Sequence, residues 1–101
     1  MDIETATREN VPILTVILNN QKMAGYDRKL PVAQHGFRFN RMSGDYCGVA
    51  RALGAFAERV TERADIAPAI ERAKAHIATG QTAVLEIMTC RGNRVPAPQP
   101  V

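Results

Sequence analysis

The sequence predicts an α/β fold, namely one half of a doubly wound parallel sheet with about three strands, flanking helices and a long loop. Apolar runs rich in β-branched residues alternate with segments of helical periodicity, which is the order that builds a parallel sheet with right-handed crossovers. So few strands are unusual, because a parallel sheet needs helices on both faces. The chain of 101 residues is therefore expected to hold part of one domain.

The first strand is predicted in the stretch 11–18, VPILTVIL, which is followed by Asn19 and Asn20. An almost entirely apolar run of this kind is typical of a strand that is buried on both faces. Open α/β sheets bind ligands at the carboxyl ends of their parallel strands. The two amide side chains could therefore serve a hard cation and a phosphate, or they could simply make a turn.

Helix caps and periodicity predict the neighbouring elements. A polar helix is expected over 2–10, before the first strand. Asp45 is expected to cap a helix that ends near Gly54, with an apolar face made of Tyr46, Val49, Ala50 and Leu53. Periodicity alone would let this helix continue, but Gly54 and the alternation that follows it favour a short strand over 56–60.

A further helix is predicted over 66–79, with Asp65 as its N-cap and Gly80 just after its end. Its buried stripe is expected to consist of Ile66, Ile70, Ala73 and Ile77. The last strand is predicted over 82–89, and the three prolines within 91–101 predict a flexible tail. The range 21–44 shows no sustained period and is expected to be a long loop, which marks an incomplete domain or a functional segment.

Composition argues against several classes of protein. The net charge is only +3, and no basic stripe with interleaved aromatic residues suggests nucleic-acid binding. No apolar run approaches the roughly 18 residues of a membrane span, and no secretory signal opens the chain. Cys47 and Cys90 stand apart without CxxC spacing, so we expect reduced thiols in the cytoplasm, while a disulfide has no support.

Other reactive or charged side chains have a plain structural interpretation. Cys47 and Cys90 are expected to be small packing residues rather than nucleophiles, because no histidine lies near either in the sequence. Glu86 is expected to form a strand-end salt bridge or to lie at a sheet edge, rather than to be catalytic. Solvent exposure is favoured over anion binding or proton transfer for the loop residues Arg28, Lys29, His35, Arg38 and Arg41.

Three segments follow one another in a recognisable order: the helix IETATREN, the apolar strand that ends in Asn19 and Asn20, and the closing unit GDYCGVARALGAFAERV, AIERAKA and TAVLEI. Together they resemble the C-terminal thiamine-diphosphate-binding domain of enzymes of the acetolactate synthase and pyruvate decarboxylase type. The span YDRKLPVAQ is similar to the acetolactate-synthase-like branch. The resemblance extends from Asp2 to Thr89, and it assigns 1–90 to a partial thiamine-diphosphate-binding domain with loop 21–44.

The resemblance implies a site for thiamine diphosphate and Mg²⁺. In this family a Gly-Asp-Gly motif precedes the Asn pair, and its Asp and one Asn hold a magnesium ion that bridges the cofactor diphosphate. The position that matches the metal-binding Asn is Asn20, and a backbone carbonyl ligand falls on Lys22. Asn19 matches the amide that braces the loop, and Met23 is placed among the cofactor contacts. Mg²⁺ is hard and takes few protein oxygens beside phosphate, so this ligand set is chemically reasonable.

The resemblance also implies a parent enzyme that acts on 2-keto acids by carboligation or decarboxylation, as a homodimer or tetramer. No Gly-Asp-Gly precedes Val11, and the catalytic glutamate of the family lies on an N-terminal domain. We therefore expect a fragment that has no catalytic residue and is inactive alone. The alternative is a non-catalytic small α/β module that pairs with another chain through its sheet edge and apolar loop.

Overall fold

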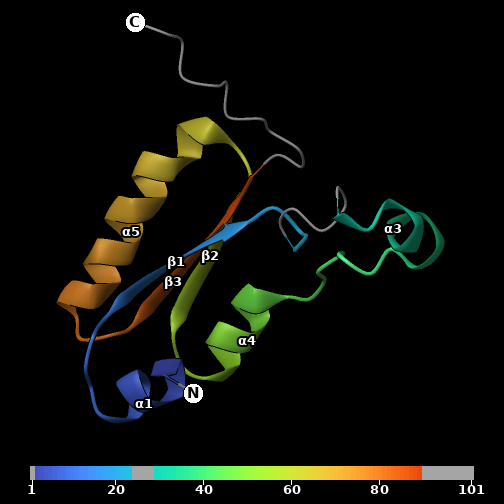
Figure 1. Ribbon diagram of the computed structural model, residues 1–101. Helices are drawn as coiled ribbons and strands as arrows, with labels where there is room; N and C mark the ends of the chain where they lie inside the picture. Colours follow the sequence, from blue (N-terminus) through green and yellow to red (C-terminus); the bar gives the residue numbers. More distant parts are fainter. Residues whose placement is uncertain (1, 24–28, 90–101) are drawn as a thin grey trace, which may run out of the picture.

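The computed structural model shows a parallel sheet with helices on both faces, and it describes residues 2–23 and 29–89 (Figure 1). The predicted α/β class with parallel strands is therefore confirmed. The regular elements, in chain order, are α1 (Asp2–Arg8), β1 (Leu14–Asn19), α3 (Pro31–Phe37), α4 (Tyr46–Ala52), β2 (Phe56–Val60), a 3₁₀ turn (Arg63–Asp65), α5 (Ile66–Ala78) and β3 (Ala83–Met88).

The last of the described strands, β3, lies at the centre of the sheet. The strand order is β1-β3-β2, and both pairings are parallel. Val84, Leu85 and Glu86 of β3 are completely buried. A central parallel strand is covered on both faces and flanked on both edges, which explains the largely apolar composition of β3.

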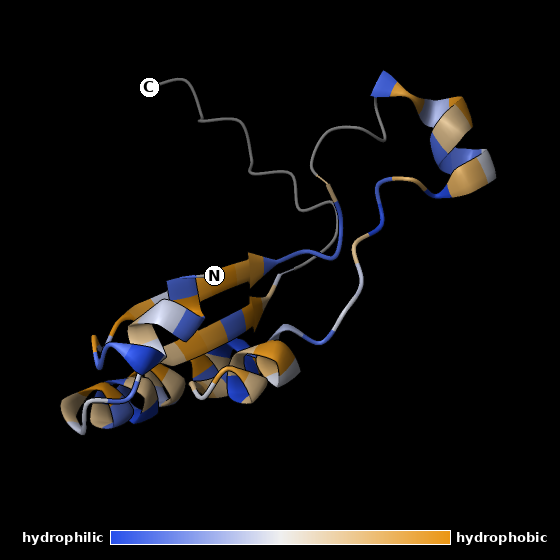
Figure 2. Cartoon of the chain, turned by 90° about the horizontal axis from the view of Figure 1, so that it is seen from below, coloured by the Kyte–Doolittle hydropathy of each residue, from blue (hydrophilic) through white to orange (hydrophobic). Residues whose placement is uncertain are grey.

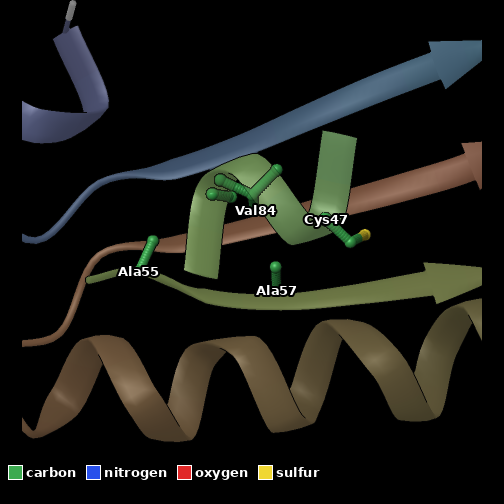
Figure 3. Close-up of a cluster of buried hydrophobic side chains, with 5 residues drawn as sticks. Cys47, Ala55, Ala57 and Val84 are labelled. Carbon is green, nitrogen blue, oxygen red and sulfur yellow. The ribbon is translucent and has the colours of Figure 1, made fainter. Parts of the chain in front are cut away.

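Each face of the sheet has its own apolar cluster. On the face covered by α5, the buried residues are Val60, Ala69, Ala73, Ala83 and Leu85. On the face covered by α4, they are Cys47, Ala50, Ala55, Ala57 and Val84 (Figure 3). Ile3 of α1 and Ile17 of β1 pack against this second cluster. Because alanine is common in both clusters, the helices can pack close to the sheet.

β1 differs from the predicted strand buried on both faces. It lies at the edge of the described sheet, and its residues alternate between exposed and half-buried. Val16 and Leu18 are 46% and 71% exposed, because α5 covers mainly β3 and β2. The strands are largely hydrophobic along their length, as their orange colour in Figure 2 shows. The prediction was wrong on this point because an apolar run shows that a strand can be buried, but not which neighbours cover it.

The range 21–44 contains a helix that the sequence did not predict. Pro31 opens α3 at a position where its missing N–H is harmless. The helix has only seven residues, stands away from the sheet and has no buried residue (Figure 1). Two turns are too short to show a clear helical period in the sequence. An antiparallel bridge between Lys22 and Arg41 closes the base of this segment.

The predicted helix caps are confirmed with one exception. The Asp45 carboxylate accepts a hydrogen bond from the Gly48 N–H at 2.9 Å, and Gly54 and Gly80 adopt positive φ after α4 and α5. The Asp65 side chain makes no capping hydrogen bond, because a 3₁₀ turn leads into α5 instead.

The predicted apolar face of α4 was wrong in one position. Val49 is 58% exposed, and Cys47 is buried beside Ala50 instead. The sequence treated Cys47 only as a small packing residue, so its burial agrees with that interpretation. Cys90 and the predicted tail 91–101 lie outside the described residues.

Replacement of Leu85 by alanine is expected to lower the free energy of unfolding by about 2–5 kcal/mol, because it leaves a cavity at the centre of the sheet. Urea denaturation measures the change. Val49→Ala is the control, because Val49 is 58% exposed. Its effect should stay within about 0.5 kcal/mol. Equal losses for the two variants would contradict the central position of β3.

Candidate functional site

A pocket of about 400 Å³ lies at the carboxyl end of the sheet, where parallel α/β sheets bind ligands. Every strand contributes to it: Asn19 ends β1, Arg59 belongs to β2, and Glu86 and Met88 belong to β3. The remaining wall comes from the two ends of the loop, Gln21 and the segment 41–44. The pocket therefore joins the strand ends to the base of the loop.

The carboxylate of Glu86 connects three elements at the floor of this pocket. Asn19 Nδ2 donates to Glu86 Oε1 at 2.7 Å, and Arg59 Nε donates to Glu86 Oε2 at 2.8 Å. The Cys47 thiol, at the start of α4, donates to the same Oε2 at 3.5 Å. Of the two alternatives predicted for Glu86, the salt bridge is confirmed and the sheet edge does not apply, because β3 is the central strand.

Burial and hydrogen bonding act in opposite directions on the charge of Glu86. Burial raises the pKa of this carboxyl because the charged form loses its hydration. The hydrogen bonds from Arg59, Asn19 and Cys47 outweigh burial and hold the pKa of Glu86 below its ordinary value. The hydrogen bond to Glu86 also raises the pKa of Arg59, so both groups stay charged at neutral pH.

The two predicted amides form consecutive turns of the Asx type. Asn19 Oδ1 accepts from the Gln21 N–H at 2.7 Å, and Asn20 Oδ1 accepts from the Lys22 N–H at 3.1 Å. Gln21 has a positive φ of 60° between them. The sequence left two interpretations of this pair open, a turn or a ligand site. The structure shows the turn, while ligand binding by these residues stays a prediction.

The structure brings together some of the predicted site residues. Asn19 lines the pocket, and Asn20 and Lys22 lie in the adjoining turn. The Met23 N–H donates to the Asn40 carbonyl oxygen at 2.7 Å, and the Met23 side chain is 45% exposed. Of the loop cations, Arg41 lines the pocket, Arg28 lies outside the described residues, and His35 is exposed on α3.

Sequence reasoning missed Arg59, which lines the pocket and forms an ion pair with Glu86 at its floor. The alternation of β2 could have indicated the orientation of Arg59, because it places this residue on the same face of the strand as Ala57. The register between β2 and β3, which places Arg59 opposite Glu86, could not be read from the sequence. The partner was therefore visible only once the strand order was known.

The oxygen donors of the turn fit part of a magnesium site. Asn20 Oδ1 and the Lys22 carbonyl are neutral oxygens of the kind that Mg²⁺ accepts. Asn20 Oδ1 uses one lone pair for the Lys22 N–H and retains a second. Within residues 2–23 and 29–89, no cluster of three or more His, Cys, Asp or Glu side chains could hold a metal. Two neutral oxygens fill only part of the octahedral coordination of Mg²⁺.

The parallel sheet, with the Asn turn at its carboxyl edge, is an α/β domain of the kind that binds ligands at this edge. Residues 1–87 match the family described as "Thiamine pyrophosphate enzyme, C-terminal TPP binding domain". The chain belongs to this family, which confirms the resemblance inferred from its motifs. Among the described residues, none of the helices has the length and apolar character that crossing a bilayer requires.

Two curated relatives resemble the chain over most of its length. The sulfoacetaldehyde acetyltransferase of Alcaligenes xylosoxydans xylosoxydans is 32% identical over an alignment of 95 residues, and the match covers 90% of this chain. The sulfoacetaldehyde acetyltransferase of Castellaniella defragrans is 32% identical over an alignment of 94 residues, and the match covers 89% of this chain. The aligned part spans only 16% of each relative.

The thiol of Cys47 is expected to resist alkylation in the folded protein. Burial raises its pKa, and the hydrogen bond and negative charge of Glu86 raise it further, so little thiolate forms at neutral pH. In a Cys90→Ser background, iodoacetamide should label Cys47 slower by a factor of about ten or more in the native protein than in urea. Equal rates by mass spectrometry would show that Cys47 is accessible and reactive.

Proposed function

We propose that this chain supplies one side of a magnesium and thiamine diphosphate site in an enzyme that acts on a carbonyl substrate. The observation that carries this proposal is the turn from Asn19 to Lys22, which lies at the carboxyl edge of a parallel sheet in a member of the TPP-binding family. At that edge, α/β sheets leave room for a ligand.

In this proposal the residues of the turn hold the metal and the cofactor. Asn20 gives its Oδ1 and Lys22 its carbonyl oxygen to Mg²⁺, which balances the charge of the diphosphate. Asn19 braces the turn through its hydrogen bonds to Glu86 and Gln21, and Met23 contacts the cofactor. The bound cofactor supplies an electron sink for the carbonyl chemistry, while these residues bind and orient it.

Two substrate classes follow from different observations. The motifs of the sequence favour a 2-keto acid and carboligation or decarboxylation of the acetolactate synthase type, as a transferase or lyase. The relatives are named sulfoacetaldehyde acetyltransferases, which favours acetyl transfer that involves sulfoacetaldehyde. Both are carbonyl compounds, so the same cofactor chemistry serves either one.

The proposed enzyme needs segments beyond those seen here. The aligned part spans 16% of each relative, and the described residues contain no acidic metal cluster. We propose that the Gly-Asp-Gly carboxylate and the catalytic glutamate of the family come from other segments, in a homodimer or tetramer. The exposed Val16 and Leu18 support such a covering partner. A cytoplasmic location fits the free thiol of Cys47.

A second proposal, a non-catalytic interaction module, is favoured by the same exposed face of β1. Among the described strands, β1 pairs only with β3, so its other edge could receive a strand from another chain. The two proposals differ in whether the turn from Asn19 to Lys22 binds a ligand.

Calorimetry with thiamine diphosphate and Mg²⁺ tests whether the site is shared with other segments. The chain alone should bind weakly, because its turn offers neutral oxygens and lacks the carboxylate. Tight binding by the chain alone would contradict the shared site. The reading frame before Met1 is an independent check: an in-frame Gly-Asp-Gly supports the enzyme, and a stop codon beside a ribosome-binding site supports the module.

A further inference from the structure

We propose that Glu86 is a positioning residue, which orients the side-chain amide of Asn19 and thereby sets the turn that carries Asn20 and Lys22. The importance of this turn for magnesium and diphosphate rests on the proposed function. The geometric claim itself concerns only the contacts of the folded chain.

The two oxygens of Glu86 have different partners. Oε1 accepts from Asn19 Nδ2, while Oε2 accepts from Arg59 and Cys47. An ionised carboxylate can only accept hydrogen bonds, so the Asn19 amide must turn its NH₂ group toward Glu86. The opposite orientation would place the Asn19 carbonyl oxygen against a negatively charged oxygen. Glu86 therefore selects one of the two orientations of the amide.

The selected orientation directs Asn19 Oδ1 toward the backbone of the turn. There it accepts from the Gln21 N–H at 2.7 Å. Gln21 has a φ of 60°, a left-handed conformation that a non-glycine residue adopts at a cost and keeps only where its surroundings hold it. The next N–H, from Lys22, then meets Asn20 Oδ1. The oxygens proposed for the metal are thus placed by a chain of contacts that begins at Glu86.

Glu86 is itself a fixed reference point. Its side chain is completely buried in the central strand, and Arg59 lies opposite it in the register of β2 and β3. The Arg59 side chain is 43% exposed, and it pairs with the buried carboxylate through Nε while its Nη2 lies 3.7 Å from Asp45 Oδ1. Residues that are fixed in this way behind the ligand-binding residues hold those residues in a single geometry.

Amide proton exchange by NMR on the full chain tests the proposal. Glutamine in place of Glu86 has a single acceptor oxygen, so its NH₂ group must face either Asn19 or Arg59. In Glu86→Gln we expect the Asn19 Nδ2 protons and the Gln21 amide to exchange faster by about tenfold. The Phe56 amide, which donates to the Thr82 carbonyl at the other end of the sheet, should keep its rate.

The chain offers a matched control for the loss of a Glu–Arg pair. Glu58 of β2 pairs with Arg72 of α5 on the opposite face of the sheet, away from the pocket. Glu58→Gln should leave the Gln21 rate unchanged. If Glu86→Gln speeds exchange of Phe56 as much as that of Gln21, the role of Glu86 is only structural and the proposal fails.

A double-mutant cycle tests whether the effect of Glu86 on the turn passes through Asn19. Asn19→Ala keeps the pair of Glu86 and Arg59, and it should speed Gln21 exchange as Glu86→Gln does. The double variant should exchange no faster than Asn19→Ala alone, and additive effects would overturn the proposal.

If Glu86→Gln does not fold, Glu86→Asp keeps the charge but withdraws the carboxylate, and an unchanged Gln21 rate there would refute the proposal. None of these measurements needs the cofactor. They therefore test the role of Glu86 separately from the proposed function, and either one can fail without the other.

Discussion

The structure depends on one buried negative charge, the carboxylate of Glu86 in the central strand. Such a charge is tolerated only where it is paired and hydrogen-bonded, and loss of a partner typically costs about 3–5 kcal/mol. Arg59, Asn19 and Cys47 satisfy it from β2, the end of β1 and the start of α4. Parallel pairing places the carboxyl ends of the strands side by side. The contacts of Glu86 then tie side chains from these ends together at the floor of the pocket.

The local elements could be predicted where a single residue controls them. Asp45 and Gly54 mark the ends of α4 because capping and positive φ are local properties. The predicted capping by Asp65 was wrong because the cap position alone does not reveal the 3₁₀ turn that precedes α5. The exposed face of β1 and the register of Arg59 opposite Glu86 depend on strand order, which a single sequence does not encode locally.

The candidate site could be predicted only in part, because only some of its contacts are local in the sequence. Asn19 and Asn20 follow a recognisable strand, so the turn could be placed from the sequence, and their family role came from the resemblance. Glu86 was judged correctly as an ion-pair residue, but its contact with Asn19 joins residues 67 positions apart. The exposed apolar residues of β1, such as Leu18, are consistent with a surface that further segments of a longer protein would cover.

The central claim is that the turn after β1 is the metal-facing edge of a diphosphate site. Paramagnetic broadening of the ¹⁵N-labelled chain by Mn²⁺ with thiamine diphosphate tests it directly, because this measurement also detects weak binding. We expect the strongest broadening at the Asn20 and Lys22 amides, and we expect Asn20→Ala to remove most of it. Broadening that is absent from this turn, or that is the same in Asn20→Ala, would contradict the claim.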